Sequence, residues 1–275
     1  MMFLPRKGRP RRPEAGRNAH RRDRGLFSKD ELQRYARHIT LPEIGGVGQR
    51  RLKTARVLVV GAGGLGSPVL LYLAAAGVGT IGVIDDDAVD VSNLQRQIIH
   101  RNATLDMPKV RSARQELAAL NPFVRVKPYH RRLTSGIAVD LISEYDLVLD
   151  GTDSYATRAL INKAAQASGR AVIAGAISAW EGQVTLYDPA QGAPCFACIF
   201  PQASAPGLAV TCAETGVIGA LPGVIGTMMA MEAIKEITGA GTGLRGRMVI
   251  YDGLSAEMRT ITLTRRADCA VCGVG

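Results

Sequence analysis

The sequence predicts an α/β protein in which a mostly parallel β-sheet carries helices on both faces. Short apolar runs, typical of buried strands, alternate with amphipathic segments along most of the 275 residues. A glycine-rich turn joins the first of these runs to the helix expected after it. Hydrophobic residues make up 47% and charged residues 21% of the chain, which excludes a wholly disordered protein, a collagen-like repeat and a coiled coil.

The first predicted element is a helix that begins directly after Ser28. Ser28 and Glu31 have the spacing of a capping box, in which each side chain bonds the backbone N–H of the other residue. We expect this helix to run to about Arg37. The glycine-rich stretch 45–48 is expected to separate it from the elements that follow.

Strands and helices alternate over the next part of the chain. Strands are expected at residues 56–60, 80–84, 124–128, 145–149 and 171–174, and helices at residues 67–76, 109–120 and 155–168. Gly77 and Gly169 follow two of these helices and Asn121-Pro122 follows the other, as is common after a helix C-terminus. Because parallel strands need a crossover between them, this alternation predicts a parallel sheet.

The pattern changes after Gly175. Strands are expected at residues 183–187, 248–251 and 260–263, without a short crossover unit between them. They predict an antiparallel extension of the sheet, which also carries two Cys-x-x-Cys pairs. A further helix is expected to begin near Val217.

The glycine-rich turn Gly61-Ala62-Gly63-Gly64-Leu65-Gly66 fits the pattern G-x-G-x-x-G between a predicted strand and a predicted helix. Its glycines let backbone N–H groups approach phosphates, and the N-terminus of the next helix favours negative charge. Asp85 ends the following strand, where a carboxylate can bind ribose hydroxyls. The pattern predicts nucleotide binding; the alternatives are a structural turn and the cofactor site of an NAD-dependent dehydrogenase.

Cations and carboxylates follow the turn at consecutive strand ends. Arg96 and Lys109 are the cations, and the carboxylates are those of the triplet 85–87, Asp150 and Asp153. Phosphate-bond chemistry uses cations against developing negative charge and a carboxylate to hold Mg²⁺, whereas hydride transfer needs neither. Each residue alone has a plainer explanation, since a lone cation is usually solvated and Asp153 could cap the next helix.

Four of the five cysteines form the pairs Cys195/Cys198 and Cys269/Cys272. Two Cys-x-x-Cys pairs can supply four thiolates to one tetrahedral Zn²⁺ ion, and we expect a closed structural zinc site; a redox role for each pair is the alternative. Cys212 is the cysteine outside these pairs.

The net charge of +10 is unevenly distributed. Residues 1–27 carry nine Lys/Arg and two Asp/Glu, or +7, and are expected to form a disordered basic tail, so the domain at 28–275 carries only +3. Nucleic-acid binding is therefore not expected. The uncharged run 215–231 is rich in glycine and shorter than a comfortable membrane span, and we expect a cytoplasmic protein without a membrane segment.

Residues 34–275 resemble the MoeB/ThiF/HesA family, relatives of the ubiquitin-activating enzymes, most closely in its MoeB branch. The matching segments are residues 34–39, the glycine-rich turn, Ser92-Asn93-Leu94-Gln95-Arg96-Gln97, Pro108-Lys109-Val110, Gly151-Thr152-Asp153, Glu181-Gly182-Gln183, residues 211–214 and both cysteine pairs. The resemblance implies a Rossmann-like sheet in a homodimer. It also implies ATP-dependent adenylation of the C-terminal glycine of a ubiquitin-like sulfur carrier, MoaD-like or ThiS-like, for molybdopterin or thiamine synthesis.

The partner is then expected to end in Gly-Gly, and the sulfur to come from a separate donor protein. A family member that activates another carboxylate, on tRNA or on a peptide, is the alternative within the family. A nucleic-acid-binding protein with a degenerate nucleotide site is the alternative from another class.

The resemblance also implies roles for individual residues. Asp85 would bind ribose, Asn93, Arg96 and Lys109 the triphosphate, and Asp153 the Mg²⁺ ion, while Arg37 would act from the second subunit. The remaining residues expected to line the nucleotide are Gly61, Gly63, Gly64, Ser92, Leu94, Gln95 and Ser154; the family often has asparagine at the last of these positions. Cys212 matches a position where relatives carry a reactive thiol, with an idle buried cysteine as the alternative.

Overall fold

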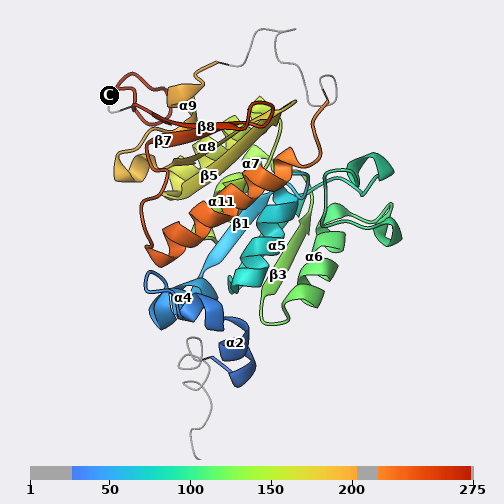
Figure 1. Ribbon diagram of the computed structural model, residues 1–275. Helices are drawn as coiled ribbons and strands as arrows, with labels where there is room; N and C mark the ends of the chain where they lie inside the picture. The colour runs from blue at the N-terminus through green and yellow to red at the C-terminus, as the bar shows by residue number, and fades with distance from the viewer. Residues whose placement is uncertain (1–26, 203–215, 274–275) are drawn as a thin grey trace, which may run out of the picture.

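A computed structural model describes residues 27–202 and 216–273 of the chain (Figure 1). One eight-stranded sheet runs through the protein in the order β3-β2-β1-β4-β5-β6-β7-β8. The first five strands in this order are parallel and the last three pair antiparallel. The strands are β1 (Arg56–Val60), β2 (Thr80–Asp85), β3 (Arg125–His130), β4 (Leu147–Asp150), β5 (Ala171–Ser178), β6 (Glu181–Tyr187), β7 (Arg247–Asp252) and β8 (Glu257–Thr262).

Helices cover both faces of the sheet (Figure 1). One face carries α4 (Gly45–Thr54), α5 (Gly66–Ala76), α6 (Lys109–Leu120) and α11 (Leu221–Thr238), and the other carries α7 (Ser135–Ser143) and α8 (Tyr155–Ser168). The shorter helices are α2 (Lys29–Arg34), α3 (Ala36–Ile39) and α9 (Phe196–Ile199), with 3-10 turns η1 (Val91–Asn93), η2 (Asn102–Thr104) and η3 (Pro189–Gln191). Within the described ranges, every helix is too short or too polar to span a lipid bilayer.

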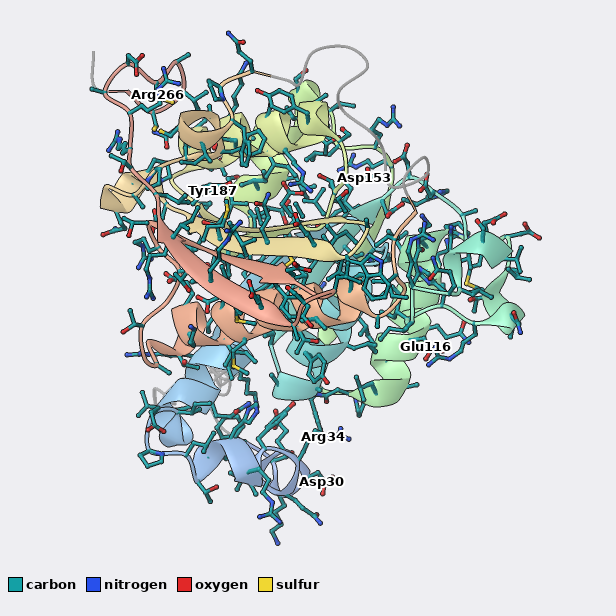
Figure 2. The ribbon with its side chains drawn as sticks, turned by 45° about the horizontal axis from the view of Figure 1, so that its top comes forward. Asp30, Arg34, Glu116, Asp153, Tyr187 and Arg266 are labelled. Carbon is teal, nitrogen blue, oxygen red and sulfur yellow. The ribbon has the colours of Figure 1, made fainter. Side chains whose placement is uncertain are left out.

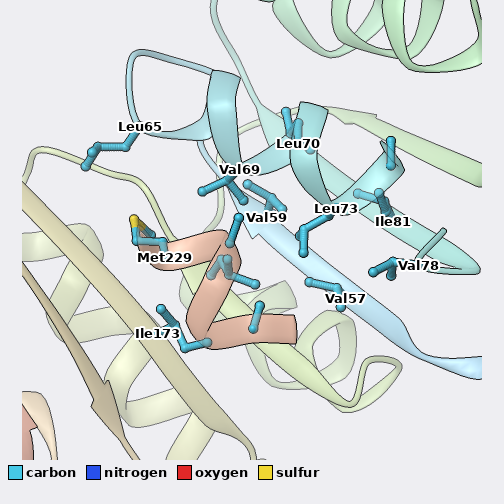
Figure 3. Packing of buried hydrophobic residues seen from close by; sticks show 14 of the residues in the cluster. Val57, Val59, Leu65, Val69, Leu70, Leu73, Val78, Ile81, Ile173 and Met229 are labelled. Atoms are coloured by element: carbon cyan, nitrogen blue, oxygen red, sulfur yellow. The ribbon is translucent and has the colours of Figure 1, made fainter. Parts of the chain in front are cut away.

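The central strand β1 shows why the chain folds as three layers. Its side chains alternate between the faces, so that Val57 and Val59 pack against α5 in one core while Leu58 and Val60 pack in the core under α7 and α8. Figure 3 shows the first of these cores, in which Val59 lies near Val69 of α5 and Met229 of α11 is buried nearby. A strand buried on both faces is apolar at nearly every position, as the predicted parallel sheet requires.

Most predicted elements are confirmed, with strand ends moved by a few residues. The capping box holds, because Glu31 N donates to Ser28 Oγ at 3.2 Å and Ser28 N donates to Glu31 Oε2 at 2.9 Å. The helices predicted at 109–120 and 155–168 have those bounds. The antiparallel extension is confirmed as β6, β7 and β8.

Several details differ from the prediction. The first helix ends at Arg34, and a separate short helix carries Arg37. The glycine-rich stretch 45–48 starts helix α4 because tertiary packing of Leu52 and Gly48 overrides the poor helix propensity of glycine. Helix α7 was not predicted. Helix α11 begins at Leu221 rather than Val217, which instead forms a bridge with Ala179.

Candidate functional site

The glycine-rich turn lies where the order of the parallel strands reverses. Strands β1 and β4 are neighbours, and the chain leaves β1 for α5 on one face and β4 for α8 on the other. The turns after the two strands touch: a Cβ on Gly61 would lie 3.2 Å from Gly151 O. Gly61 also has a φ of 94°, which favours glycine. Ligands of open α/β sheets bind at such a switch point.

Two helices begin beside this turn. Helix α5 starts at Gly66, and a Cβ on Gly64 would lie 3.2 Å from Cβ of Pro222 in the first turn of the 18-residue helix α11. The unpaired N–H groups and the dipole of a helix N-terminus favour negative charge. Two helix N-termini therefore make the surroundings of the turn favourable to negative charge without any basic side chain.

Asp85, at the end of β2, is bonded to the turn. Ala62 N donates to Asp85 Oδ2 at 2.7 Å, and Asp87 N donates to Asp85 Oδ1 at 2.9 Å. Burial raises the pKa of Asp85, against the opposing effects of these two N–H groups and of Lys109. Each carboxylate oxygen keeps accepting capacity, so Asp85 can still accept hydrogen bonds from ribose hydroxyls.

Lys109, the first residue of α6, points back to the same strand end. Its Nζ lies 2.7 Å from Asp87 Oδ2, and its backbone N–H donates to Asp87 O at 2.9 Å. The Lys109 side chain is only 7% exposed whereas that of Asp87 is 64% exposed. A buried ammonium with one solvated partner can exchange that partner for a phosphate oxygen at little cost.

The segment 92–97 passes over the turn. Asp90 caps η1 by accepting from Ser92 N at 2.8 Å and Ser92 Oγ at 2.6 Å, and Asn93 Oδ1 accepts from Asp90 N at 3.2 Å. Arg96 Nη1 donates to Ser92 O at 3.1 Å. A Cβ on Gly64 would lie 3.7 Å from Arg96 Cγ, so this arginine lies against the turn. Leu94 is half-buried and Gln95 is exposed, with a backbone contact to Gly219.

Hydrogen bonds fix the backbone of the loop after β4, which carries Asp153. Thr152 N and Thr152 Oγ1 donate to the buried Asp150 Oδ1 at 3.0 and 2.7 Å, and Arg158 Nη2 donates to Thr152 O at 2.6 Å. Ser154, not Asp153, caps α8, because Thr157 N donates to Ser154 Oγ at 3.1 Å. The Asp153 carboxylate is exposed and forms no hydrogen bond to another described residue.

These features fit a Mg²⁺ ion. Mg²⁺ in proteins is usually held by one or two carboxylates together with substrate phosphates and water. Asp153 offers one uncommitted carboxylate two residues after the carbonyl that touches Gly61. The oxygens of Asp85, Asp86 and Asp87 lie within 4.8 Å of one another on the neighbouring strand end, but the first and last are already hydrogen-bonded.

Arg37 is not brought to this site within one chain. It is exposed on α3, and Tyr35 just before it packs against Gly77, at the far end of α5 from the turn. Eleven residues of α5 separate the two ends by roughly 16 Å. Figure 2 shows Asp153 and Arg34, the latter at the end of α2 just before Arg37, at opposite ends of the molecule.

The four paired cysteines converge into one buried cluster. Cys195 Sγ lies 3.6 Å from Cys269 Sγ and 3.9 Å from Cys198 Sγ, and Cys198 Sγ lies 3.4 Å from Cys272 Sγ. All four sulfurs lie within 4.8 Å of one another, and none is in a disulfide. Sulfurs bound to one tetrahedral Zn²⁺ ion at about 2.3 Å are about 3.8 Å apart, so the cluster fits zinc. The pairs lie at α9 and after β8, rather than on the antiparallel strands.

Hydrogen bonds from outside orient this cluster. Asn162 Nδ2 donates to Cys195 Sγ at 3.6 Å while its Oδ1 accepts from Phe196 N, and Arg266 N donates to Cys198 Sγ at 3.5 Å. Burial opposes ionisation of the Cys269 thiol, but hydrogen bonds from the N–H groups of Cys272 and Val271 lower its pKa to about 7. Such N–H···S contacts stabilise thiolate ligands of a metal.

The sequence did not predict a role for some residues near the turn, and one predicted residue lies outside the described part of the chain. Asp87, Arg158 and the buried His100 were not assigned roles; the run of three aspartates at a strand end was a signal only for the first. Cys212 lies outside the described residues.

The chain matches the ThiF family over residues 35–271. It is 47% identical over 251 residues to a "Sulfur carrier protein adenylyltransferase" of Thermus thermophilus, covering 90% of this chain and 93% of that protein. It is 48% identical to the "Probable adenylyltransferase/sulfurtransferase MoeZ" of Mycobacterium tuberculosis, and 45% identical to the mouse "Adenylyltransferase and sulfurtransferase MOCS3". These matches cover 87% and 91% of this chain but only 62% and 54% of the relatives.

Solved structures show the same fold. Escherichia coli MccB with ATP superposes with a TM-score of 0.77 at 21% identity, covering 88% of this chain and 75% of that one. MccB with MccA-N7isoASN gives a TM-score of 0.78 at 21% identity, covering 90% of this chain and 76% of that one. At this level of identity the likeness concerns the arrangement of the helices and strands.

Proposed function

The chain belongs to the ThiF family, and from this premise we propose that it adenylates the C-terminal glycine of a ubiquitin-like sulfur carrier protein with ATP. A carboxylate oxygen of the carrier attacks the α-phosphorus of ATP, the bond between the α-phosphorus and the bridging oxygen breaks, and pyrophosphate leaves. The products are a carrier acyl-adenylate and pyrophosphate. The names of three relatives, all of them adenylyltransferases, support this reaction over hydride transfer.

One observation supports the proposal most: two cations from different segments are linked to the same glycine-rich turn. Arg96 lies against Gly64, and Lys109 of α6 pairs with Asp87, whose N–H donates to the Asp85 carboxylate that also accepts from Ala62 N. Negative charge grows on the departing pyrophosphate, and cations fixed beside it stabilise the transition state more than bound ATP. No covalent protein nucleophile is needed, because positioning and charge can account for the step.

The remaining residues hold the nucleotide in the proposed site. Gly61, Gly63 and Gly64 present the backbone of the turn to the phosphates, Asp85 accepts from the ribose hydroxyls, and Asn93 contacts the triphosphate. Ser92, Leu94, Gln95 and Ser154 line the same space. When bound, Mg²⁺ would be held by Asp153 and would neutralise charge on the phosphates. The four-cysteine cluster would hold Zn²⁺ in a closed structural site, remote from the reacting atoms.

Arg37 enters the proposed site from a second copy of the chain. In one copy it lies near the far end of α5 from the turn, so in this proposal it reaches the triphosphate across a dimer interface. A homodimer with two such sites would place one guanidinium from each subunit against the phosphates bound by the other.

Exchange of labelled pyrophosphate into ATP tests the reaction. The wild type should catalyse exchange only when a carrier ending in Gly-Gly is present, and Asp153→Ala and Arg96→Ala should abolish it. Near-normal exchange in both variants would contradict the assignment of the site. Arg266→Ala is a matched control, because this arginine pairs with Asp268 beside the cysteine cluster and should not affect exchange.

Two finer points of the proposal have their own tests. The carrier is of the molybdopterin or the thiamine type, and exchange rates with one carrier of each type decide between them. A reactive Cys212 would form a reducible adduct with the carrier that is lost in Cys212→Ser, while adenylation itself would continue in that variant.

A further inference from the structure

His100 is a buried side chain beside the glycine-rich turn that the proposed chemistry does not use. It is 3% exposed and lies three residues after the segment 92–97 that passes over the turn. Its Nε2 lies 2.9 Å from Ala62 O, and its Nδ1 lies 2.9 Å from Ser112 Oγ. Both ring nitrogens are thus committed to partners inside the protein.

The hydrogen bonds of His100 close a ring that links the turn to α6. On one side Ala62 N donates to Asp85, Asp87 N donates to the same carboxylate, and Lys109 pairs with Asp87. On the other side Ala62 O contacts His100, which contacts Ser112 one helical turn after Lys109 on α6. Ala62, which is fully buried, is therefore held at both its N–H and its carbonyl.

The protonation of the ring follows from these partners. A carbonyl oxygen only accepts, so Nε2 carries the proton that is donated to Ala62 O. Nδ1 faces the Ser112 hydroxyl, whose Oγ donates to the buried Thr104 Oγ1 at 2.9 Å. Burial lowers the pKa of His100, as does the charge of Lys109 and Arg101, against the bond to Ala62 and the charge of Glu116.

We propose that His100 is a positioning residue for ATP: its Nε2–H fixes the Ala62 carbonyl, and so holds the glycine-rich turn at a set distance from Lys109. The inference rests on the proposed function, since it assumes that the turn and Lys109 bind the phosphates of one nucleotide. Without this bond the carbonyl is unpaired and buried, and the turn is free to relax away from the geometry that suits the triphosphate.

Two amide variants of His100 distinguish a role in positioning the Ala62 carbonyl from a role in filling space. In His100→Gln the side-chain NH₂ reaches the place of Nε2 and can still donate to Ala62 O, but the contact with Ser112 is lost. In His100→Asn the shorter amide reaches only the place of Nδ1, so the contact with Ser112 is kept and the bond to Ala62 O is lost. Each variant gives up one of two buried hydrogen bonds, which makes each the control for the other.

The measurement is the Kd of ATP by calorimetry without the carrier, together with the thermal unfolding temperature of each variant. We expect His100→Asn to raise the Kd about fivefold to tenfold, as one lost hydrogen bond predicts, and His100→Gln to change it less than twofold. Equal Kd values for the two variants would overturn the inference. A wild type that binds no ATP would instead contradict the proposed function.

A spectroscopic measurement on the wild type serves if an amide variant fails to fold. The chain has four histidines, so the ring nitrogens can be assigned by ¹⁵N NMR of labelled protein. With ATP bound, His100 should be protonated at Nε2. A neutral ring protonated at Nδ1 would overturn the inference, because it could not donate to Ala62 O.

Discussion

Replacing Lys109 by methionine should slow catalysis strongly while leaving the fold almost as stable as before. Methionine keeps the length and the apolar stem of the buried side chain, and removes only the ammonium that lies 2.7 Å from Asp87 Oδ2. Its partner is 64% exposed, so the carboxylate left behind is solvated. Since desolvation of the ammonium offsets much of the attraction, we expect the free energy of unfolding to change by about 1 kcal/mol or less.

The expected loss of rate is much larger. A cation removed from developing charge on a phosphate in a water-poor site costs about 3–4 kcal/mol, or a factor of about 10²–10³ in kcat. The assay is single-turnover formation of the carrier acyl-adenylate at saturating ATP, alongside urea unfolding of the same preparations. A kcat within twofold of the wild type would refute the role of Lys109 at the phosphates, and a large loss of stability would show that Lys109 is structural instead.

Lys53→Met is the matched control because its ion pair has the opposite exposure. Lys53 Nζ lies 2.8 Å from Glu31 Oε1, and here the carboxylate is the buried partner, with 7% of its side chain exposed. Removing this lysine strands a buried charge, so the variant should be less stable by roughly 2–3 kcal/mol. The pair lies at the opposite end of the sheet from the turn, and kcat should not change.

Three further predictions concern the rest of the account. Wild-type protein purified without chelators should carry a zinc ion, and Cys269→Ser should lose it. The ion links Cys195 to Cys269 across 74 residues, so its loss should lower the free energy of unfolding by about 4 kcal/mol if this link acts as other cross-links do. A wild type without zinc would contradict this prediction. Mixing equal amounts of the inactive variants Arg37→Ala and Asp153→Ala should restore about a quarter of wild-type exchange, because half of the dimers are mixed and each has one complete site. No recovery after subunit exchange would place Arg37 outside the shared site. Burial lowers the pKa of His100 in the folded state, so below about pH 6.5 the unfolded state binds a proton that the folded state does not. As the pH is lowered, the wild type should therefore lose up to about 1.4 kcal/mol of stability per pH unit more than His100→Gln does. Parallel stability curves for the two proteins would show that His100 titrates normally.

The layers of the fold could be predicted because each local signal agrees with the packing. The alternating burial of Val57, Leu58, Val59 and Val60 needs helices on both faces, and the glycine after β1 marks the turn into α5. Where local and tertiary preferences disagreed, the prediction was wrong. Three glycines at 45–48 form part of a helix because Gly48 packs closely on Thr238, a contact that no sequence window contains.

The residues of the candidate site could be predicted where they belong to sequence motifs, and not where their position depends on long-range contacts. The glycine-rich turn, Arg96 and Lys109 stand at recognisable spacings; Arg96 lies against the turn, and Lys109 is linked to it through Asp87 and Asp85. The bond between His100 and Ala62 joins residues 38 apart in sequence and leaves no pattern. Arg37 is the opposite case. It belongs to a recognisable motif, but within one chain it does not lie at the turn.

The mass of the carrier after reaction tests the central claim most directly. Wild-type protein, ATP, Mg²⁺ and a carrier ending in Gly-Gly should give a carrier heavier by one adenylyl group, with one pyrophosphate released for each adenylate formed. A carrier without its last glycine should remain unmodified. An unchanged mass for the intact carrier while ATP is bound or hydrolysed, or an adenylyl group on the shortened carrier, would contradict the account.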